Sequence, residues 1–138
     1  MPDASHVGRR YRAEGQVIDA ERVRAFAASI AGGADLPDLG EVPPTFAAVY
    51  CLFPTMGQLF FDTEVGLDLT GLVHGEQEFS FHHPVHIGDV VDATAEIVSV
   101  EDKRGRVFLT LALEATRAAG GERVCSGKAL LIAPGATS

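Results

Sequence analysis

The sequence contains no tryptophan, only two cysteines, and 11 lysine and arginine residues against 19 aspartate and glutamate residues, which gives a formal charge of −8. A surface of that sign repels phosphate, and no basic cluster offsets it locally, so binding to nucleic acid is not expected. Cys51 and Cys125 form neither a CxxC pair nor a disulfide framework, as is usual in a reducing compartment. The first residues lack a secretory apolar stretch, so a cytoplasmic location is expected.

One uncharged stretch, residues 42–61, has about the length of a bilayer span. It contains Pro43, Pro44 and Pro54, and a helix interrupted in this way would leave backbone groups unsatisfied in lipid. The stretch is therefore predicted to be a buried helical segment, with no membrane association. With 46% hydrophobic and 22% charged residues, the chain is expected to form one globular domain over residues 1–138.

Two segments of the first half show helical patterns. Asp19 is expected to cap a helix that ends at Gly32-Gly33. The apolar face of this helix is Val23, Phe26, Ala27, Ile30 and Ala31. Residues 44–53 are apolar nearly all round, which predicts a helix buried on every side, and a short second helix is expected over residues 54–61.

After Gly71 the pattern changes to a period of two, which predicts strands over residues 73–82, 91–100, 107–114 and 124–132, with an opening strand at 8–18. In the first of these, Val73, Gly75, Gln77, Phe79 and Phe81 share one face, and His74, Glu76, Glu78, Ser80 and His82 share the other. Turns at 101–106 and 118–122 link consecutive strands, so an antiparallel meander of class α+β is predicted. A long sheet and one apolar helix pack best when the sheet wraps the helix. That is the hot-dog fold, whose sheets usually pair edge to edge into dimers.

Several motifs occur together in a fixed order. They are Pro43-Pro44-Thr45-Phe46 before the apolar helix, then His74-Gly75-Glu76-Gln77-Glu78-Phe79, then Pro84-Val85-His86-Ile87-Gly88-Asp89, with Val7-Gly8-Arg9-Arg10-Tyr11 at the start. In this order they resemble the MaoC-like hydratase/dehydratase family, and more narrowly its N-terminal, FAS1-like dehydratase branch. The resemblance extends over nearly the whole chain.

The resemblance implies reversible loss of water from a 3-hydroxyacyl thioester, giving the trans-2-enoyl thioester. This reaction needs a base for the α-proton, an acid for the leaving hydroxyl, and donors for the enolate-like oxygen. Since the two prolines have no N–H, the backbone amides of Thr45 and Phe46 are the expected donors. An acyl channel is expected between helix and sheet, lined by Phe46, Val49, Tyr50, Phe53, Leu59, Phe60 and Gln77. No cofactor or metal is expected.

The catalytic members of this family would be expected to carry Asp-x4-His just after the first helix. Here residues 32–41 contain no histidine, and no aspartate in the sequence is followed by a histidine five positions later. Glu78 and His83 have this spacing, but an odd separation along a strand sends them to opposite faces. The catalytic pair is missing.

A-type subunits of the (3R)-hydroxyacyl-carrier-protein dehydratases in this branch also lack the pair, which a B-type MaoC subunit supplies across the interface. The resemblance therefore implies an acyl-binding subunit in fatty-acid or polyketide metabolism. Its expected partners are an acyl thioester of coenzyme A or carrier protein, and a MaoC-type catalytic chain or a second copy of itself.

Two other functions stay open. A stand-alone hot-dog thioesterase, or a dehydratase with a rearranged site, would use His74, Glu76, Asp62 or Glu64, and among these His74 and Glu76 are the first catalytic candidates. A homodimer could instead hold an acyl group without any reaction.

Two further groups of side chains are expected to be structural. His82, His83 and His86 are close in sequence, but strand neighbours point apart and Pro84 turns the chain, so a zinc site is not expected. Cys51 is expected to be buried and unreactive.

Overall fold

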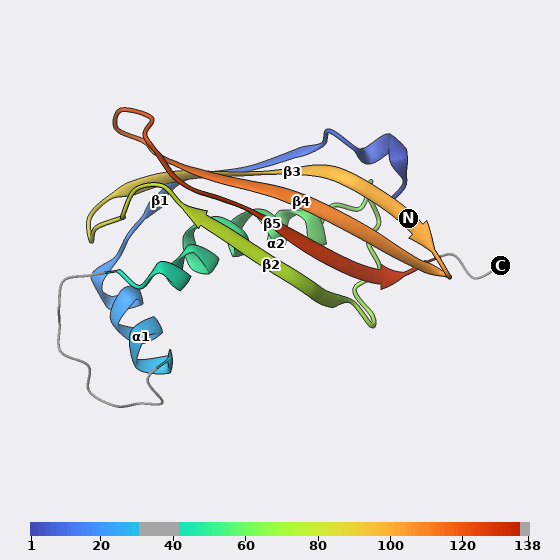
Figure 1. Cartoon of the computed structure of the whole chain (residues 1–138), viewed down its shortest axis with the longest axis horizontal. Coiled ribbons are helices and arrows are strands. Elements are labelled where there is room, and N and C mark those ends of the chain that lie inside the picture. Colours follow the sequence, from blue (N-terminus) through green and yellow to red (C-terminus); the bar gives the residue numbers. More distant parts are fainter. Residues whose placement is uncertain (31–41, 136–138) are drawn as a thin grey trace.

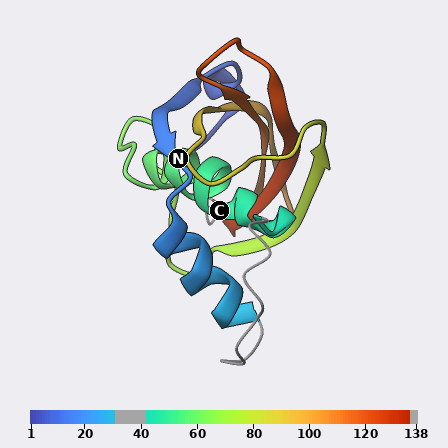
Figure 2. The same cartoon turned by 90° about the vertical axis from the view of Figure 1, so that its left-hand side faces the viewer.

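A computed structural model describes residues 1–30 and 42–135, and its five strands form one antiparallel sheet in the order β1-β3-β4-β5-β2. The strands are β1 (Arg10–Val17), β2 (Val73–Phe81), β3 (Val90–Lys103), β4 (Arg106–Arg117) and β5 (Arg123–Pro134). The helices are α1 (Ala20–Ile30) and α2 (Phe53–Phe60). The long sheet curls around α2 and the helical turns before it (Figures 1 and 2), as predicted.

Three strands, β3, β4 and β5, form the predicted meander. Arg104 and Gly105 join β3 to β4 with φ values of 53° and 75°, the positive values that a two-residue type I′ turn requires. The prediction is wrong for β2, which pairs with β5 rather than with the strand that follows it. Because β1 pairs with the side of β3 that β4 leaves free, β2 cannot pair with β3, and it joins the sheet at the free side of β5.

The core lies between the helical segment and the inner face of the central strands. Alternate residues of these strands are buried, and several are alanine, which leaves room for the helix. The inner face consists of Val91, Ala93, Ala95 and Ile97 of β3, Leu109, Leu111, Leu113 and Ala115 of β4, and Cys125, Ala129, Leu131 and Ala133 of β5. The predicted alternation in these strands is confirmed.

The helical segment is continuous but irregular. It begins with a 3-10 turn, Pro44–Phe46, and passes through a π-helical turn, Ala48–Leu52, into α2. Pro54 has no N–H to donate, and the turn before it widens, so that the Phe53 N–H is donated to the Ala48 carbonyl. The buried Thr55 hydroxyl donates to the Cys51 carbonyl oxygen at 2.7 Å, which satisfies one acceptor of the widened turn.

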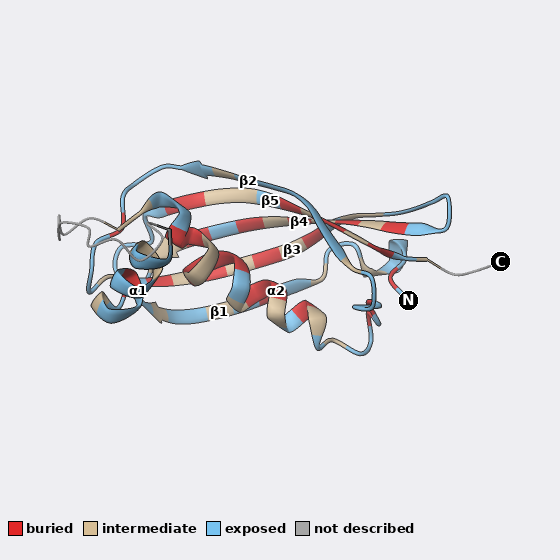
Figure 3. Cartoon of the chain, turned by 90° about the horizontal axis from the view of Figure 1, so that it is seen from below, coloured by how far each residue is buried: buried red, intermediate tan, exposed pale blue. Residues whose placement is uncertain are grey.

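The prediction that residues 44–53 form a helix buried on every side is wrong at Phe53, whose side chain is 55% exposed, and at Pro44 and Thr45, which are also exposed. The segment packs on β1, β3 and β4, so its opposite face is turned away from the sheet. Figure 3 shows this placement, with β2 exposed along the opposite edge. No helix in the described part of the chain has the length and apolarity needed to cross a bilayer.

Helix α1 begins as predicted, because Asp19 Oδ1 accepts the Glu21 N–H at 3.2 Å. Val23 is buried, and the ring of Phe26 meets the ring of Phe46 edge to face, with centroids 5.3 Å apart. The Ile30 side chain, Ala31 and the predicted stop at Gly32-Gly33 lie outside the described residues. Helix α1 therefore supports the start of the central helical segment.

Candidate functional site

An apolar pocket of about 290 Å³ lies where the central helical segment begins, between the 3-10 turn and the end of β2. Its described lining residues are Val42, Pro43, Pro44, Tyr50, Phe81, His82, His83, Pro84 and Val85. We call it the Tyr50 pocket. None of these described residues is a carboxylate, and the titratable ones are Tyr50, His82 and His83. Most of the lining is apolar, so the pocket suits the apolar part of a ligand.

The polar groups of the Tyr50 pocket are directed toward β5. The Tyr50 hydroxyl lies 3.9 Å from Cys125 Sγ, and burial, with a further contribution from Cys125, raises the pKa of Tyr50. This hydroxyl therefore stays protonated at neutral pH. His82 Nε2 lies 2.9 Å from Ser126 Oγ, and His83 Nδ1 lies 2.8 Å from the Arg123 carbonyl oxygen. Both imidazoles thus have β5 partners.

The expected donors for an enolate-like oxygen are only partly free. The Phe46 N–H is donated to the Pro43 carbonyl at 2.9 Å, and the Ala47 N–H to the carbonyls of Pro44 and Thr45. Phe46 is therefore not a free donor, because the 3-10 turn uses its amide. Within the described residues only the Thr45 amide is left for this role, and Thr45 is exposed.

The residues predicted to line an acyl channel do not gather around one cavity. Phe46, Tyr50 and Leu59 are buried in the core, while Val49 and Phe60 are half-buried against it. Phe53 and Gln77 are exposed. Only Tyr50 among the seven lines the Tyr50 pocket.

Phe81 and Val85 line the pocket although the sequence pattern did not indicate them. Phe81 and Val85 line the same pocket as Pro44 because β2 lies at the sheet edge beside β5. No local sequence pattern reveals that pairing.

A β-bulge at Gly75 changes the faces of β2. The register shifts between His74, opposite Leu131, and Glu76, opposite Leu130. Because opposite residues project to the same face, His74 lies on the inner face, and its Nε2 lies 3.0 Å from Gln77 Oε1. Glu76 lies on the convex face. The prediction that His74 and Glu76 share a face is therefore wrong, and the two cannot act as a pair.

Asp62 and Glu64, the other acidic candidates, lie after α2 in an ion-pair cluster with β1. Arg9 donates to Asp62 through Nε at 2.6 Å and through Nη2 at 3.1 Å, and also contacts Glu64 at 2.9 Å. The Tyr11 hydroxyl donates to Asp62 Oδ2 at 2.8 Å.

Titration of this cluster follows from these contacts. Burial alone would raise the pKa of Asp62, but the hydrogen bonds from Arg9 and Tyr11 outweigh it and lower that pKa. Burial and the Asp62 contact raise the pKa of Tyr11 to about 12. These contacts are structural, since they tie α2 to β1.

The remaining candidate residues do not form a metal or nucleophile site. Among residues 1–30 and 42–135, no three histidine, cysteine, aspartate or glutamate side chains are placed to hold a metal ion. His86 Nδ1 lies 3.7 Å from Asp89 Oδ2, whereas His82 and His83 have their partners on β5, so the three histidines do not share a contact. Cys51 is fully buried, and its hydrogen bond with Cys125, together with burial, raises the pKa of the Cys51 thiol. That thiol is poorly suited to act as a nucleophile.

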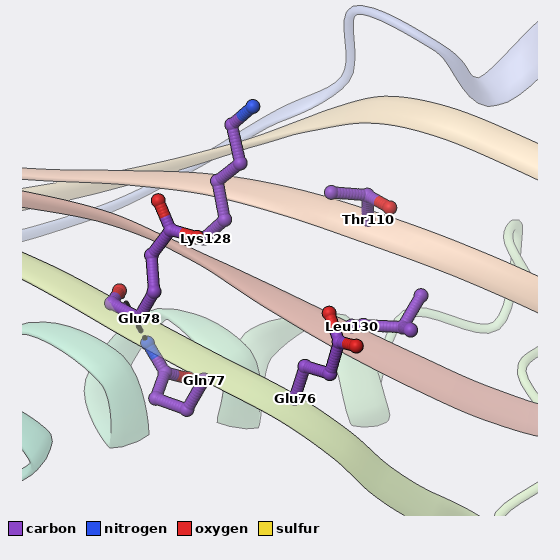
Figure 4. A pocket seen from close by; sticks show the side chains of 6 residues that line it. All are labelled: Glu76, Gln77, Glu78, Thr110, Lys128 and Leu130. Atoms are coloured by element: carbon purple, nitrogen blue, oxygen red, sulfur yellow. Dashed lines mark hydrogen bonds between the residues drawn. The ribbon is translucent and has the colours of Figure 1, made fainter.

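A second hollow, of about 370 Å³, lies on the convex face of β2, β5 and β4. Its lining residues are Glu76, Gln77, Glu78, Thr110, Lys128 and Leu130. Figure 4 shows the side chains of Glu76 and Glu78 on one side of β2 and that of Gln77 on the other. On the convex side, β2 itself therefore carries two carboxylates, and Lys128 of β5 lies opposite Glu78.

Comparison with known proteins places this geometry in context. Residues 38–126 match the family model for the FAS1-like, dehydratase domain region. A UPF0336 protein of Saccharopolyspora erythraea is 33% identical, over 98% of this chain and 94% of its own length. A UPF0336 protein of Streptomyces coelicolor is 32% identical, over 95% of this chain and 94% of its own.

Solved structures give the same picture. A chain of the truncated HadBC (3R-hydroxyacyl-ACP dehydratase) complex of Mycobacterium tuberculosis is 27% identical, with a TM-score of 0.73 over 92% of this chain and 96% of that one. A MaoC-like dehydratase is 26% identical, with a TM-score of 0.74 over 96% of this chain and 43% of that one. The predicted hot-dog fold and the predicted resemblance are confirmed.

Proposed function

The chain belongs to the family of FAS1-like dehydratase domains, and from this premise we propose that it is the acyl-binding, non-catalytic subunit of an (R)-specific 3-hydroxyacyl-thioester dehydratase or enoyl-thioester hydratase. The observation that carries the proposal is the missing acid/base pair. The family match extends over most of the chain, yet no aspartate in the sequence is followed by a histidine five positions later. A fold kept without its catalytic residues fits a binding subunit.

The side chains that could have replaced the pair are placed unfavourably. His74 and Glu76 lie on opposite faces of β2, and Asp62 is held by Arg9 and Tyr11. The base must reach the α-hydrogen and the acid the hydroxyl oxygen on the adjacent carbon of one substrate molecule, so neither set serves elimination of water. This argues against the stand-alone thioesterase or dehydratase.

The Tyr50 pocket is the proposed site for the acyl group. Its lining is apolar, and the protonated Tyr50 hydroxyl is a neutral group that an acyl chain tolerates. The thioester would be carried by coenzyme A or by an acyl carrier protein, in fatty-acid or polyketide metabolism. Similarity to a chain of a 3R-hydroxyacyl-ACP dehydratase complex supports this substrate class.

The catalytic residues would come from a MaoC-type partner subunit that carries Asp-x4-His. In the complex, its base removes the α-proton, its acid protonates the leaving hydroxyl, and the present chain holds the acyl tail. The exposed edge of β2 is the proposed docking strand, because it ends beside the Tyr50 pocket at Phe81.

The test is hydration of crotonyl coenzyme A, followed by loss of enoyl absorbance. The purified chain, a MaoC-type subunit with Asp-x4-His from the same source, and an equimolar mixture are compared. We expect hydration activity in the equimolar mixture and none with the purified chain alone. Hydration at ordinary enzyme rates by the chain alone would overturn the proposal, and tight acyl-thioester binding with no activity in any mixture would favour the non-catalytic homodimer.

Acyl binding is tested by Phe81→Ala in the mixture. Removal of this lining ring is expected to raise KM several-fold for a ten-carbon enoyl thioester but not for crotonyl coenzyme A, because the short chain does not need the full pocket. Phe61→Ala is the matched control, since Phe61 is 86% exposed and does not line the pocket. An equal effect on KM for both substrates would show that Phe81 contributes to assembly of the two subunits and not to acyl binding.

A further inference from the structure

The edge strand β2 has a backbone edge that is open for pairing and a convex face that is acidic. One side of β2 pairs with β5, and its other side faces no strand in the described chain. Glu76 and Glu78 project from the convex face, opposite Leu130 and Lys128 of β5. Both are exposed, and within residues 1–30 and 42–135 neither is in an ion pair. Figure 4 shows both side chains on the same side of β2, that of Glu78 toward Lys128 and that of Glu76 toward Leu130.

Pairing of β2 with a second copy of itself would bring like charges together. A two-fold axis makes the pairing antiparallel and self-complementary. If the axis passes through Gln77, the centre of β2, Glu76 of each copy lies opposite Glu78 of the other. If it passes through Glu76 or Glu78, that residue lies opposite its own copy. These registers pair the most residues, and each places carboxylates directly opposite one another, which is destabilising.

From this geometry, and resting on the function proposed above, we propose that β2 selects a second hot-dog chain whose facing edge strand carries lysine or arginine on its convex side, and that it disfavours a second copy of this chain. Such a partner would complete the sheet through backbone hydrogen bonds, which are the same for any chain. The carboxylates would then provide the discrimination, because they attract a basic edge and repel an acidic one.

The overall charge acts in the same direction. Two copies of a chain with a formal charge of −8 repel each other at long range, whereas a basic partner edge is attracted. On the inner face the same strand presents His74, Gln77 and Phe79, and none of these is an acidic residue. The electrostatic selection therefore rests on Glu76 and Glu78.

The experiment uses a charge-reversed copy of this chain, Glu76→Lys/Glu78→Lys, as the probe for a basic edge. Sedimentation velocity measures the dissociation constant of the wild-type chain, of the variant, and of their equimolar mixture. We expect the mixed dimer to form at least about tenfold more tightly than either self-dimer. That advantage should fall between about 50 mM and about 500 mM salt, because exposed charges are screened.

Two further variants keep the test specific. Glu76→Gln/Glu78→Gln removes the charge without reversing it, and should let the variant self-associate several-fold more tightly than the wild-type chain. Glu14→Lys/Glu101→Lys makes the same change of net charge at two exposed sites away from β2, and mixing it with the wild-type chain should give no tenfold gain. A gain of equal size would show a net-charge effect and overturn the role of β2.

Equal dissociation constants for the wild-type chain alone and for the mixture would also overturn the inference. This measurement contains no substrate and no catalytic subunit, so its outcome is separate from the hydration assay. If sedimentation shows no preference for the mixed dimer but hydration still depends on a partner, only the proposed selection by Glu76 and Glu78 is overturned. Failure of the hydration assay, with the mixed dimer still favoured, removes the proposed function and leaves the pairing rule.

Discussion

Strands β1 and β2 form the two edges of the same sheet, and they differ in how their backbones are occupied. In β1, the register shifts between Ala13 and Gln16, and the Gly15 N–H is donated to Asp92 Oδ1 at 2.9 Å. The Arg12 carbonyl accepts a hydrogen bond from Gln58 Nε2 of α2 at 2.6 Å. The Gly15 contact is made to β3, on the side of β1 that is already paired. The bulge twists the edge, and the Gln58 contact occupies a carbonyl that another strand would need, so both features hinder strand addition at the free edge.

Strand β2 also has a bulge, at Gly75, but in the described part of the chain no side chain from another element is hydrogen-bonded to its backbone. It is nine residues long and exposed throughout except at Phe79, which is half-buried, and only its own Gln77 reaches a β2 carbonyl. Long exposed edges are templates for pairing with another chain. The two edges therefore differ in that a side chain of α2 occupies the backbone of β1, whereas the backbone of β2 is left open for pairing.

The largest expected effect on stability comes from disturbing the pairing of β2 with β5, because it would remove one of the two edges compared above. A Cβ on Gly127 would lie 2.1 Å from the Glu78 carbonyl oxygen and 3.0 Å from Phe79 Cδ1. We expect Gly127→Val to lower the free energy of unfolding by about 3 kcal/mol, because the backbone of β2 must move. Urea denaturation measures the change.

Gly57→Ala is the control for this substitution, since nothing lies within 4 Å of a Cβ at this position in α2. It should stabilise the chain by about 0.5–1 kcal/mol, because alanine favours the helix. A Gly127→Val variant as stable as the wild-type chain would contradict the close β2–β5 approach.

The next largest effect is expected at the closed edge, where Tyr11 of β1 holds Asp62 at the end of α2. Tyr11→Phe removes a hydrogen bond to a carboxylate and should cost about 2 kcal/mol of unfolding free energy. Tyr50→Phe is the matched control, because among residues 1–30 and 42–135 the hydrogen-bond partner of that hydroxyl is Cys125 Sγ, at 3.9 Å, and a loss below about 0.5 kcal/mol is expected. Equal losses in thermal or urea unfolding would show that the Asp62 contact adds nothing.

Acid should weaken the closed edge through Asp62, whose pKa is lowered in the folded chain. A lowered folded pKa contributes stability above the unfolded value of about 3.9, and this is lost as the pH falls through the folded value. The stability difference between the wild-type chain and Asp62→Asn should therefore be full at neutral pH and shrink below about pH 4. Urea unfolding at several pH values measures it.

Asp102→Asn, at an exposed position on β3, is the control for the acid experiment. A gap between the wild-type chain and Asp62→Asn that stayed constant from neutral pH to pH 3 would mean that Asp62 does not titrate as its contacts indicate.

The smallest expected effect compares two glutamines, one at each edge. Gln58→Ala removes the hydrogen bond to the Arg12 carbonyl and should lower the free energy of unfolding by about 1 kcal/mol. Gln77→Ala on β2 removes only exposed contacts with His74 and Glu78, and less than about 0.5 kcal/mol is expected. The reverse order in denaturant unfolding would contradict the view that side chains close only the β1 edge.

The parts of the fold that depend on local pattern could be predicted from the sequence. Alternation identified β3, β4 and β5, Asp19 marked the start of α1, and the turn around Gly105 followed from its composition. Pairing of β2 with β5 could not be predicted, because it depends on which sheet edge β1 leaves free. The two faces of β2 were misassigned at His74, since one bulged residue at Gly75 reverses the alternation.

The candidate site was less accessible to sequence reasoning than the fold. Tyr50 was found because it lies on the apolar segment, but Phe81 and Val85 reach the same pocket through long-range pairing. The free amide expected at Phe46 is used by the 3-10 turn, which hydropathy does not reveal. Only the absence of Asp-x4-His could be read directly from the chain, because a missing motif needs no geometry.

The π-helical turn at Ala48–Leu52 lies between the start of the helical segment and α2, and it contains one extra residue. Its hydrogen bond reaches back five residues rather than four, so it accommodates one residue more than an α-helical turn. Loss of that residue would restore an α-helical turn and keep Pro44–Phe46 and α2 in nearly the same relative orientation, whereas loss of a residue from α2 itself would rotate the two by about 100°, at 3.6 residues per turn. When related sequences are aligned, a one-residue gap therefore belongs in this turn. A chain without this extra residue would change the position of Tyr50 within the turn, while α2 would keep its packing against β1.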